Sequence, residues 1–214
     1  MMSKPLKVLV TGSEGFIGKN LVLKLNEYSK FQTIEFNRKS NPKKINELIK
    51  KCDALIHLAG ENRPKNESDF LSSNVNLTRT ICDEIIKQDS KIPLVFSSST
   101  QVKLDNPYGK SKLEAEKIIT DTFKDRKNSV TIFRLPGVFG KWSKPNYNSV
   151  VATFCHNIAN DIDINISDPN KIVSLVYIDD VMKSLIDAID NDSGVHQQTI
   201  NQVHEISLDN LQNR

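Results

Sequence analysis

The stretch Val8-Leu9-Val10-Thr11-Gly12-Ser13-Glu14-Gly15-Phe16-Ile17-Gly18 joins an apolar run to a helix-like segment through a glycine-rich turn. In such a turn Gly12 permits the tight bend, Gly15 lets the backbone approach a pyrophosphate, and Gly18 lets the helix pack closely on the sheet. The helix N-terminus then stabilises the phosphate charge. A glycine-rich turn also forms without a ligand, but a strand before it and a helix after it are the context of a dinucleotide site, which we predict here.

Apolar runs alternate with helix-like segments along most of the chain. Short, nearly continuous apolar strands separated by helices indicate a parallel sheet covered on both faces. Right-handed crossovers then give a doubly wound α/β fold of the Rossmann type. We expect strands over residues 7–11, 33–36, 54–58, 93–97 and 130–135, and helices over residues 16–26, 43–51, 68–88 and 108–123.

The alternation loosens after residue 135. We expect a helix over 149–160, a strand over 171–176 and a helix over 178–189, covering the carboxyl ends of the strands, where doubly wound proteins bind ligands. The chain then forms a single domain, with a cofactor-binding core over residues 1–135 and a partial, small C-terminal substrate-binding lobe over residues 136–214. A helix begins near Leu208 as the chain stops, which predicts a truncated piece of a longer protein.

Length, charge and cysteine usage narrow the class of protein. A chain of 214 residues buries a substantial core, and a net charge of +3, spread along it, argues against a nucleic-acid partner. Neither the three cysteines nor the four histidines show metal-ligand spacing, so no metal site is expected. There is no signal-peptide pattern, and no apolar run approaches the roughly 20 residues of a membrane span. We expect a cytoplasmic protein without a membrane partner.

The end of the second predicted strand bears on the choice of cofactor. An acid there holds the ribose hydroxyls of NAD, whereas a basic residue accepts the phosphate of NADP. Asn37, Arg38 and Lys39 follow the strand and Glu35 is the competing acid, so NADPH is favoured and NAD is the alternative. Asp53, just before the third strand, is a candidate acceptor for the adenine amino group, although a turn role explains it nearly as well.

A second motif, Tyr108-Gly109-Lys110-Ser111-Lys112, follows the serine-rich run Val95-Phe96-Ser97-Ser98-Ser99-Thr100. Tyr108 and Lys112 are four residues apart, so on a helix they share a face. A free tyrosine has a pKa of about 10, and a neighbouring ammonium together with a positive nicotinamide ring is expected to lower it. Ser99 ends the fourth strand, in position to hydrogen-bond a substrate carbonyl. The tyrosine–lysine spacing alone also suits an exposed pair, but after the glycine turn it predicts a redox enzyme.

Three further stretches complete a family pattern: Asn74-Val75-Asn76, Arg134-Leu135-Pro136-Gly137-Val138-Phe139-Gly140 and Tyr177-Ile178-Asp179-Asp180-Val181. With the first two motifs they resemble extended short-chain dehydrogenases/reductases of the nucleotide-sugar branch. Two more stretches resemble the reductase domain of CapF-like capsular polysaccharide enzymes of the UDP-N-acetyl-L-fucosamine pathway: Leu58-Ala59-Gly60-Glu61-Asn62-Arg63-Pro64 and Gly140-Lys141-Trp142-Ser143-Lys144-Pro145-Asn146-Tyr147-Asn148-Ser149.

The resemblance implies an NADPH-dependent reductase of the 4-keto group of a UDP-linked 2-acetamido-2,6-dideoxy-hexulose, in the synthesis of capsular or O-antigen polysaccharide precursors. It also implies a homodimer, formed through the helices over residues 68–88 and 108–123. The cupin domain of CapF-like enzymes has no counterpart in this sequence. Only the reductase half therefore carries over.

The resemblance also implies roles for single residues. Ser99, Tyr108 and Lys112 form the catalytic group, Asn74 supports a proton relay, and Pro136 packs near the nicotinamide. The expected cofactor contacts are Gly12, Gly15, Phe16, Ile17, Gly18, Asn37, Arg38, Lys39, Asp53, Leu58, Ala59, Gly60, Tyr108, Lys112 and Pro136. The expected substrate contacts are Arg63, Ser99, Lys141, Asn146, Tyr147 and Asn148.

The same motifs also occur in proteins of other function, and single residues of this sequence favour or disfavour each of these. A nucleotide-sugar dehydratase is disfavoured, because Thr100 is followed by Gln101-Val102-Lys103 where that branch has an Asp-Glu pair. An epimerase that retains NAD uses the same Ser-Tyr-Lys group and stays open. A non-catalytic NADP(H)-binding sensor or assembly subunit is the alternative from another class, although such proteins tend to lose the tyrosine or the lysine.

Overall fold

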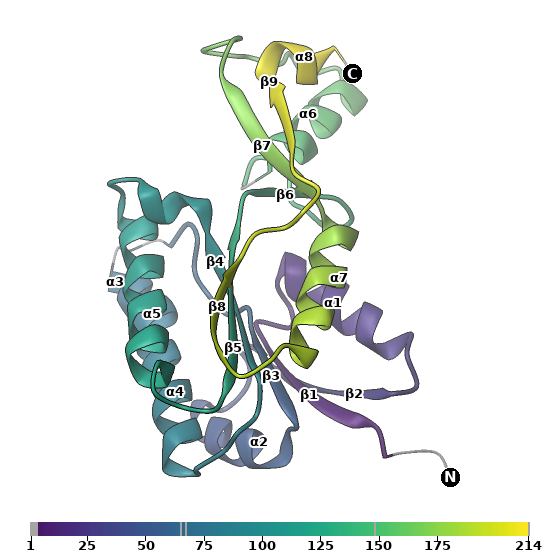
Figure 1. The fold of residues 1–214 in the computed structure, drawn as a ribbon. Helices are drawn as coiled ribbons and strands as arrows, with labels where there is room; N and C mark the ends of the chain where they lie inside the picture. Colours follow the sequence, from purple (N-terminus) through teal and green to yellow (C-terminus); the bar gives the residue numbers. More distant parts are fainter. Residues whose placement is uncertain (1–3, 65, 67, 148, 214) are drawn as a thin grey trace.

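A six-stranded parallel sheet is the framework of the molecule (Figure 1). The computed structural model describes residues 4–64, 66, 68–147 and 149–213. The strand order is β2-β1-β3-β4-β5-β8, which places the reversal of a doubly wound fold between β1 and β3. The predicted α/β doubly wound fold is confirmed. The strands are β1 (Leu6–Thr11), β2 (Phe31–Phe36), β3 (Ala54–His57), β4 (Leu94–Ser99), β5 (Ser129–Leu135) and β8 (Gly194–Gln198).

Helices cover both faces of this sheet, as Figure 1 shows. One face carries α1 (Phe16–Asn26) and α7 (Ile178–Asp187), and the other carries α2 (Ile45–Lys51), α4 (Leu77–Lys87) and α5 (Pro107–Phe123). Successive residues of β1 enter different cores: Val8 and Val10 pack with α1 and α7, whereas Leu9 packs with the other three helices. Burial on both faces explains why the strands read as continuous apolar runs.

The segment expected as one helix over residues 68–88 is divided in three. A single α-helical turn, α3 (Ser68–Phe70), leads into a π-helical segment, η2 (Leu71–Asn76), and only then into α4. A π-helical turn takes one more residue than an α-helical turn and is found mostly at functional sites. Here it turns Asn74 and Val75 inward, where both are buried.

The residues after β5 build a second, smaller sheet at the carboxyl ends of the main strands (Figure 1). It consists of β6 (Gly137–Phe139), β7 (Ile172–Tyr177) and β9 (His204–Ser207), with β7 parallel to β6 and antiparallel to β9. The helices α6 (Val150–Ala159) and α8 (Leu208–Gln212) accompany it. The boundary expected at residue 135 divides the sequence, but in space α7 and β8 return to the main sheet.

Short 3-10 turns complete the chain: η1 (Pro42–Lys44), η3 (Thr100–Lys103) and η4 (Ala188–Asp190). Among the described residues, no helix has both the length and the apolar character needed to cross a bilayer. Within the same residues, no cluster of three or more His, Cys, Asp or Glu side chains is arranged to hold a metal ion.

Candidate active site

The glycine turn after β1 is packed so closely that side chains are excluded from it. Gly12 has a φ of +71°, and a Cβ there would lie 2.7 Å from the amide nitrogen of Ala59. A Cβ on Gly18 would lie 2.1 Å from the carbonyl oxygen of Gly12. The first glycine thus sets the turn against the end of β3, and the last one brings α1 down onto the turn.

The start of α1 fits a pyrophosphate. Its N-cap, Gly15, makes no side-chain capping bond, and the first turn of the helix contains no acid. Phe16 and Ile17 pack against the apolar core, so their side chains face away from the turn. The Ser13 hydroxyl is buried and has no hydrogen-bond partner among the described residues. Free backbone N–H groups and an unpaired hydroxyl at a helix N-terminus are the donors that a diphosphate requires.

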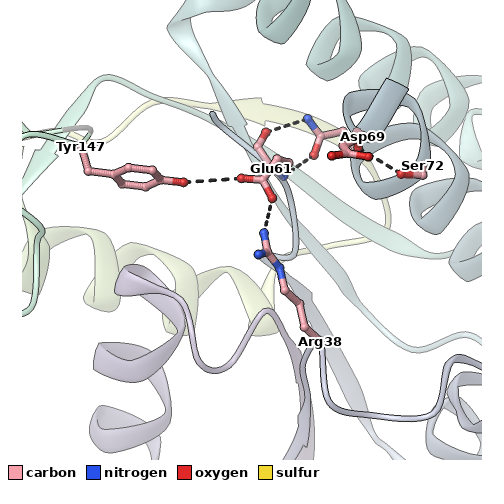
Figure 2. Close-up of polar contacts among 6 residues, drawn as sticks. Arg38, Glu61, Asp69, Ser72 and Tyr147 are labelled. Carbon is pink, nitrogen blue, oxygen red and sulfur yellow. Dashed lines mark hydrogen bonds and ion pairs between the residues drawn. The ribbon is translucent and has the colours of Figure 1, made fainter. Parts of the chain in front are cut away.

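The two basic residues that follow β2, Arg38 and Lys39, are both paired with acidic side chains. Arg38 forms an ion pair with Glu61, and Lys39 Nζ lies 2.9 Å from Glu14 Oε1. Asn37 shapes this turn, since its Oδ1 accepts a bond of 2.9 Å from the Lys39 amide. Figure 2 shows the Glu61 side chain between Arg38 and Tyr147, which lies in the loop after β6. The sequence analysis had assigned no role to Glu61.

The expected adenine contact of Asp53 is wrong. Asp53 precedes β3 at the amino-terminal edge of the sheet, and its Oδ2 accepts a bond of 2.8 Å from the Lys7 amide near the start of β1. Gly12 follows the other end of β1, so Asp53 lies at the edge of the sheet opposite the glycine turn. Its carboxylate ties two strands together, which is the structural role that the sequence had left open.

Ser99 and Tyr108 come together through a close helix contact. A Cβ on Gly109 would lie 2.1 Å from the carbonyl oxygen of Gln101, so the first turn of α5 rests directly on the 3-10 turn that follows Ser99. Asn106 caps α5, its Oδ1 accepting a bond of 2.8 Å from the Gly109 amide. Burial raises the pKa of the Tyr108 phenol, and hydrogen bonding to Ser99 opposes part of that rise.

Lys112 is buried one helical turn after Tyr108. Its Nζ donates to the Ser97 carbonyl over 2.9 Å and lies 4.8 Å from the centre of the Phe96 ring. Burial lowers the pKa of Lys112 to about 8, although Glu116 on the same helix raises it in part. The ammonium is thus directed to a carbonyl, and burial of the phenol is the main influence on the Tyr108 pKa. The lowering expected from the ammonium together with a nicotinamide ring stays a prediction.

Asn74 positions the backbone of the site. Its Oδ1 accepts a bond of 2.6 Å from the Glu61 amide, and its Nδ2 donates to the Glu61 carbonyl at 3.0 Å and to Ser111 Oγ at 2.9 Å. Ser111 in turn donates to the Tyr108 carbonyl. Both amide protons of Asn74 are used in these bonds, so its side chain positions the Glu61 backbone and Ser111. Its support of a proton relay stays a prediction.

A buried histidine with no role predicted from sequence joins the end of β1 to the start of α4. His57 Nδ1 lies 2.7 Å from Thr11 Oγ1, and His57 Nε2 lies 3.0 Å from Thr78 Oγ1. Thr78 donates its only proton to the Asn74 carbonyl, so His57 Nε2 must carry the ring proton and Nδ1 must accept. Thr11 Oγ1 also accepts from the Ala59 amide. Burial lowers the pKa of His57 to about 3, which keeps the ring neutral.

The residues expected to meet the substrate lie partly together. Tyr147 donates from its hydroxyl to Glu61 Oε1 over 3.4 Å, which brings the loop after β6 over the end of β3. Asn146 has a φ of +55°, and its amide bonds Thr153 Oγ1 at the start of α6. Arg63 and Lys141 are exposed.

The remaining residues expected at the site are the loop residue Lys141, Pro136 and Asn148. The Lys141 carbonyl accepts a bond of 2.9 Å from Asn20 on α1, which attaches this loop to the cofactor side. Pro136 is half-buried where β5 turns into β6. Asn148 lies outside the described residues.

Comparison with known proteins gives a consistent result. The sequence profile of the NAD dependent epimerase/dehydratase family matches residues 8–202. A UDP-2-acetamido-2,6-beta-L-arabino-hexul-4-ose reductase of Pseudomonas aeruginosa is 45% identical over 185 residues, which are 86% of this chain and 50% of the relative. A UDP-glucose 4-epimerase of Vibrio cholerae is 23% identical, covering 95% of this chain and 71% of the relative.

Solved structures agree with this fold. The capsular polysaccharide assembling protein CapF from Staphylococcus aureus superposes with a TM-score of 0.83 at 33% identity, covering 97% of this chain and 56% of that one. A UDP-glucuronic acid 4-epimerase from Bacillus cereus, solved with NAD, shares the fold with a TM-score of 0.83 at 18% identity, over 95% of this chain and 81% of that one. The chain thus spans about half the length of the reductase and of CapF. With a family profile matched along most of its length, this chain belongs to the NAD dependent epimerase/dehydratase family.

Proposed function

We propose that the chain is the reductase part of an enzyme that reduces the 4-keto group of a UDP-linked 2-acetamido-2,6-dideoxy-hexulose with NADPH, in the synthesis of a capsular or O-antigen precursor. One observation carries the proposal: Tyr108 is hydrogen-bonded to Ser99 at the carboxyl end of β4, and Lys112 follows one helical turn later with its ammonium on the Ser97 carbonyl. The identity of 45% to a relative named as a hexul-4-ose reductase supports this substrate class.

The cofactor would lie across the switch point between β1 and β3. Gly12, Gly15 and the N-terminus of α1 would hold the pyrophosphate. Leu58-Ala59-Gly60 would pass close to the cofactor, because Gly12 already packs against Ala59. Asn37, Arg38 and Lys39 would receive the ribose and its 2′-phosphate, which favours NADPH over NADH. Tyr108, Lys112 and Pro136 would border the nicotinamide. Residues 1–135 would thus supply most of the cofactor site.

The residues of the catalytic group have distinct tasks in this reaction. Bound NADPH supplies a hydride to the carbonyl carbon of the sugar. Tyr108 donates its phenolic proton to the carbonyl oxygen, which Ser99 orients through a hydrogen bond. A phenol is protonated at neutral pH, because its ordinary pKa is about 10, so Tyr108 has the proton that this step requires. Lys112, mostly protonated below pH 8, stabilises the phenolate that remains.

The substrate would bind between the main sheet and the residues after 135. Tyr147, Asn146 and Asn148 are proposed to contact the sugar, because Tyr147 already reaches over the end of β3. The exposed cations Arg63 and Lys141 are proposed to meet the UDP diphosphate.

The assembly and location of the enzyme follow from the same proposal. Leu71, in the π-helical segment, and Leu113, on α5, are exposed by 57% and 46% and suit a homodimer contact over residues 68–88 and 108–123. The buried free thiols Cys52 and Cys82 suit a reducing compartment, so we place the reaction in the cytoplasm.

An epimerase that retains NAD is the second candidate, because the Ser-Tyr-Lys group serves both reactions and the family profile includes epimerases. Titration of the purified protein with NADPH and NADH, followed by an assay of NADPH oxidation with a UDP-4-keto-6-deoxy sugar, separates the two. Preferential binding of NADPH and ketone-dependent oxidation support the reductase. NAD that remains bound through purification, with no net oxidation, supports the epimerase.

Tyr108→Phe tests the proton donor. The substitution removes one hydroxyl and leaves the ring packed 6.1 Å from Phe70, so we expect turnover to fall by about 10²- to 10⁴-fold with little change in the Kd for NADPH. Stopped-flow or steady-state oxidation at 340 nm measures the loss. A variant that reduces the ketone at nearly the wild-type rate shows that another group donates the proton.

A further inference from the structure

Glu61 holds a fixed place beside the predicted cofactor site. It directly follows Gly60 at the carboxyl end of β3, and the Asn74 side chain bonds both its amide, at 2.6 Å, and its carbonyl, at 3.0 Å. Asn74 is 1% exposed, so the Glu61 backbone cannot leave without uncovering a buried amide. The position of this carboxylate is therefore set by the core of the protein.

The two oxygens of the Glu61 carboxylate have partners from two distant loops, as Figure 2 shows. Oε2 pairs with Arg38, which follows β2, and Oε1 accepts from the Tyr147 hydroxyl, which lies in the loop after β6. The Glu61 side chain is only 12% exposed, whereas that of Arg38 is 81% exposed. The carboxylate is thus the fixed member of the pair and Arg38 the adaptable one.

A neighbouring pair also joins one cation to one carboxylate. Lys39 Nζ lies 2.9 Å from Oε1 of Glu14, and Glu14 belongs to the glycine turn. Two cations thus face two carboxylates, and the group after β2 is electrically neutral in the structure. A phosphate monoester can reach the full charge of Arg38 only in competition with Glu61, whose carboxylate also repels it.

We propose that Glu61 is a specificity-determining residue for the cofactor: it competes with the 2′-phosphate of the dinucleotide for Arg38 and so limits how strongly a phosphorylated ribose is preferred. This inference rests on the proposed function. It predicts that a neutral side chain of the same shape strengthens binding of the 2′-phosphorylated ligand and leaves binding of the unphosphorylated one unchanged. A residue that merely held Arg38 ready for the phosphate would produce the opposite result.

Calorimetric titration with 2′,5′-ADP and 5′-AMP isolates the 2′-phosphate, because neither ligand carries a nicotinamide. For Glu61→Gln we expect the affinity for 2′,5′-ADP to rise roughly three- to fivefold, the effect of losing one ion pair to an exposed guanidinium, and the affinity for 5′-AMP to stay constant. In an Arg38→Gln background the same substitution should have a clearly smaller effect. Glu27→Gln is the matched control, since it breaks the exposed Lys24–Glu27 pair at the end of α1 that is distant from the glycine turn.

The outcomes separate this inference from the proposed function. An unchanged or lower ratio of the two affinities in Glu61→Gln, in a protein whose circular dichroism matches the wild type, overturns the role of Glu61. Equal binding of 2′,5′-ADP and 5′-AMP by the wild type overturns it as well, because no 2′-phosphate is then recognised, but leaves a reductase that uses NADH. Failure of the wild type to bind NADPH and NADH, titrated beside these two ligands, removes the proposed function itself.

Discussion

The buried ammonium of Lys112 lowers the free energy of unfolding of the protein. Its ammonium is buried against Phe96 and the Ser97 carbonyl, and burial lowers its pKa to about 8 from the ordinary 10.5. Below pH 8 the ammonium is charged in both the folded and the unfolded chain, so its desolvation opposes folding in full. Between pH 8 and 10.5 only the unfolded chain keeps the proton, and the penalty disappears as pH rises.

We therefore expect Lys112→Met to raise the free energy of unfolding at pH 7 by on the order of 2 kcal/mol, while abolishing turnover. The gain should shrink as pH rises from 8 to 10.5. Urea unfolding at pH 7 and pH 10 measures it, with Lys117→Met, an exposed position on the same helix, as the control. A gain that does not depend on pH would mean that packing, and not charge, is responsible.

The motif residues could be placed from sequence because each occupies a strand end or a helix start. Ser99 and Tyr108 follow from the pattern of strand and helix alone, as do the glycines of the first turn. Asp53 was misplaced although its position directly before a parallel strand already puts it at the amino-terminal edge of the sheet, opposite the cofactor side. Glu61 was overlooked because its partners are 23 and 86 residues away, a distance that no local pattern spans.

At the scale of single elements, the strands that sequence did not predict are the three-residue strand β6 and the polar strands β8 and β9. The sheet edges β8 and β9 read Gly-Val-His-Gln-Gln and His-Glu-Ile-Ser, without the apolar runs of the central strands. Each is stabilised by its neighbour in the sheet, β8 by β5 and β9 by β7. Backbone pairing of this kind leaves little trace in a sequence. The π-helical segment is hidden similarly, because its helical pattern differs from an α-helix by one residue.

The start of α5 makes an element-scale prediction. Gly109 lets the helix touch the Gln101 carbonyl, and a methyl group would lie 2.1 Å from that backbone oxygen. Gly109→Ala should push the first turn of α5 away from Ser99, lowering stability by about 1–3 kcal/mol and kcat by roughly 10²-fold. NADPH binding at the glycine turn should change little. Thermal unfolding and kcat measure both effects, and Lys117→Ala on the exposed face serves as the control. Normal kcat in Gly109→Ala would show that this contact does not position Tyr108.

At the scale of the whole molecule, the part after residue 135 is joined to the cofactor side in two ways. Two hydrogen bonds bring its loop to the site: Asn20 on α1 to the Lys141 carbonyl, and Tyr147 to Glu61. In addition, α7 packs on α1 and completes one of the two apolar cores, with Val181, Met182 and Leu185 almost fully buried. The sequence boundary at residue 135 is therefore not expected to be a folding boundary.

A shortened chain tests this conclusion. Loss of α7 uncovers the apolar face of β1 and α1, and burying each large aliphatic side chain is worth about 1.5–3 kcal/mol. Three such residues on α7 together approach the total stability of a domain, roughly 5–15 kcal/mol. Residues 1–135 alone should therefore show no cooperative thermal transition, whereas residues 1–202, which keep α7 and β8, should retain one. A cooperative transition and NADPH binding by residues 1–135 would make the cofactor side an independent domain, and would mean that α7 serves the substrate site more than the core.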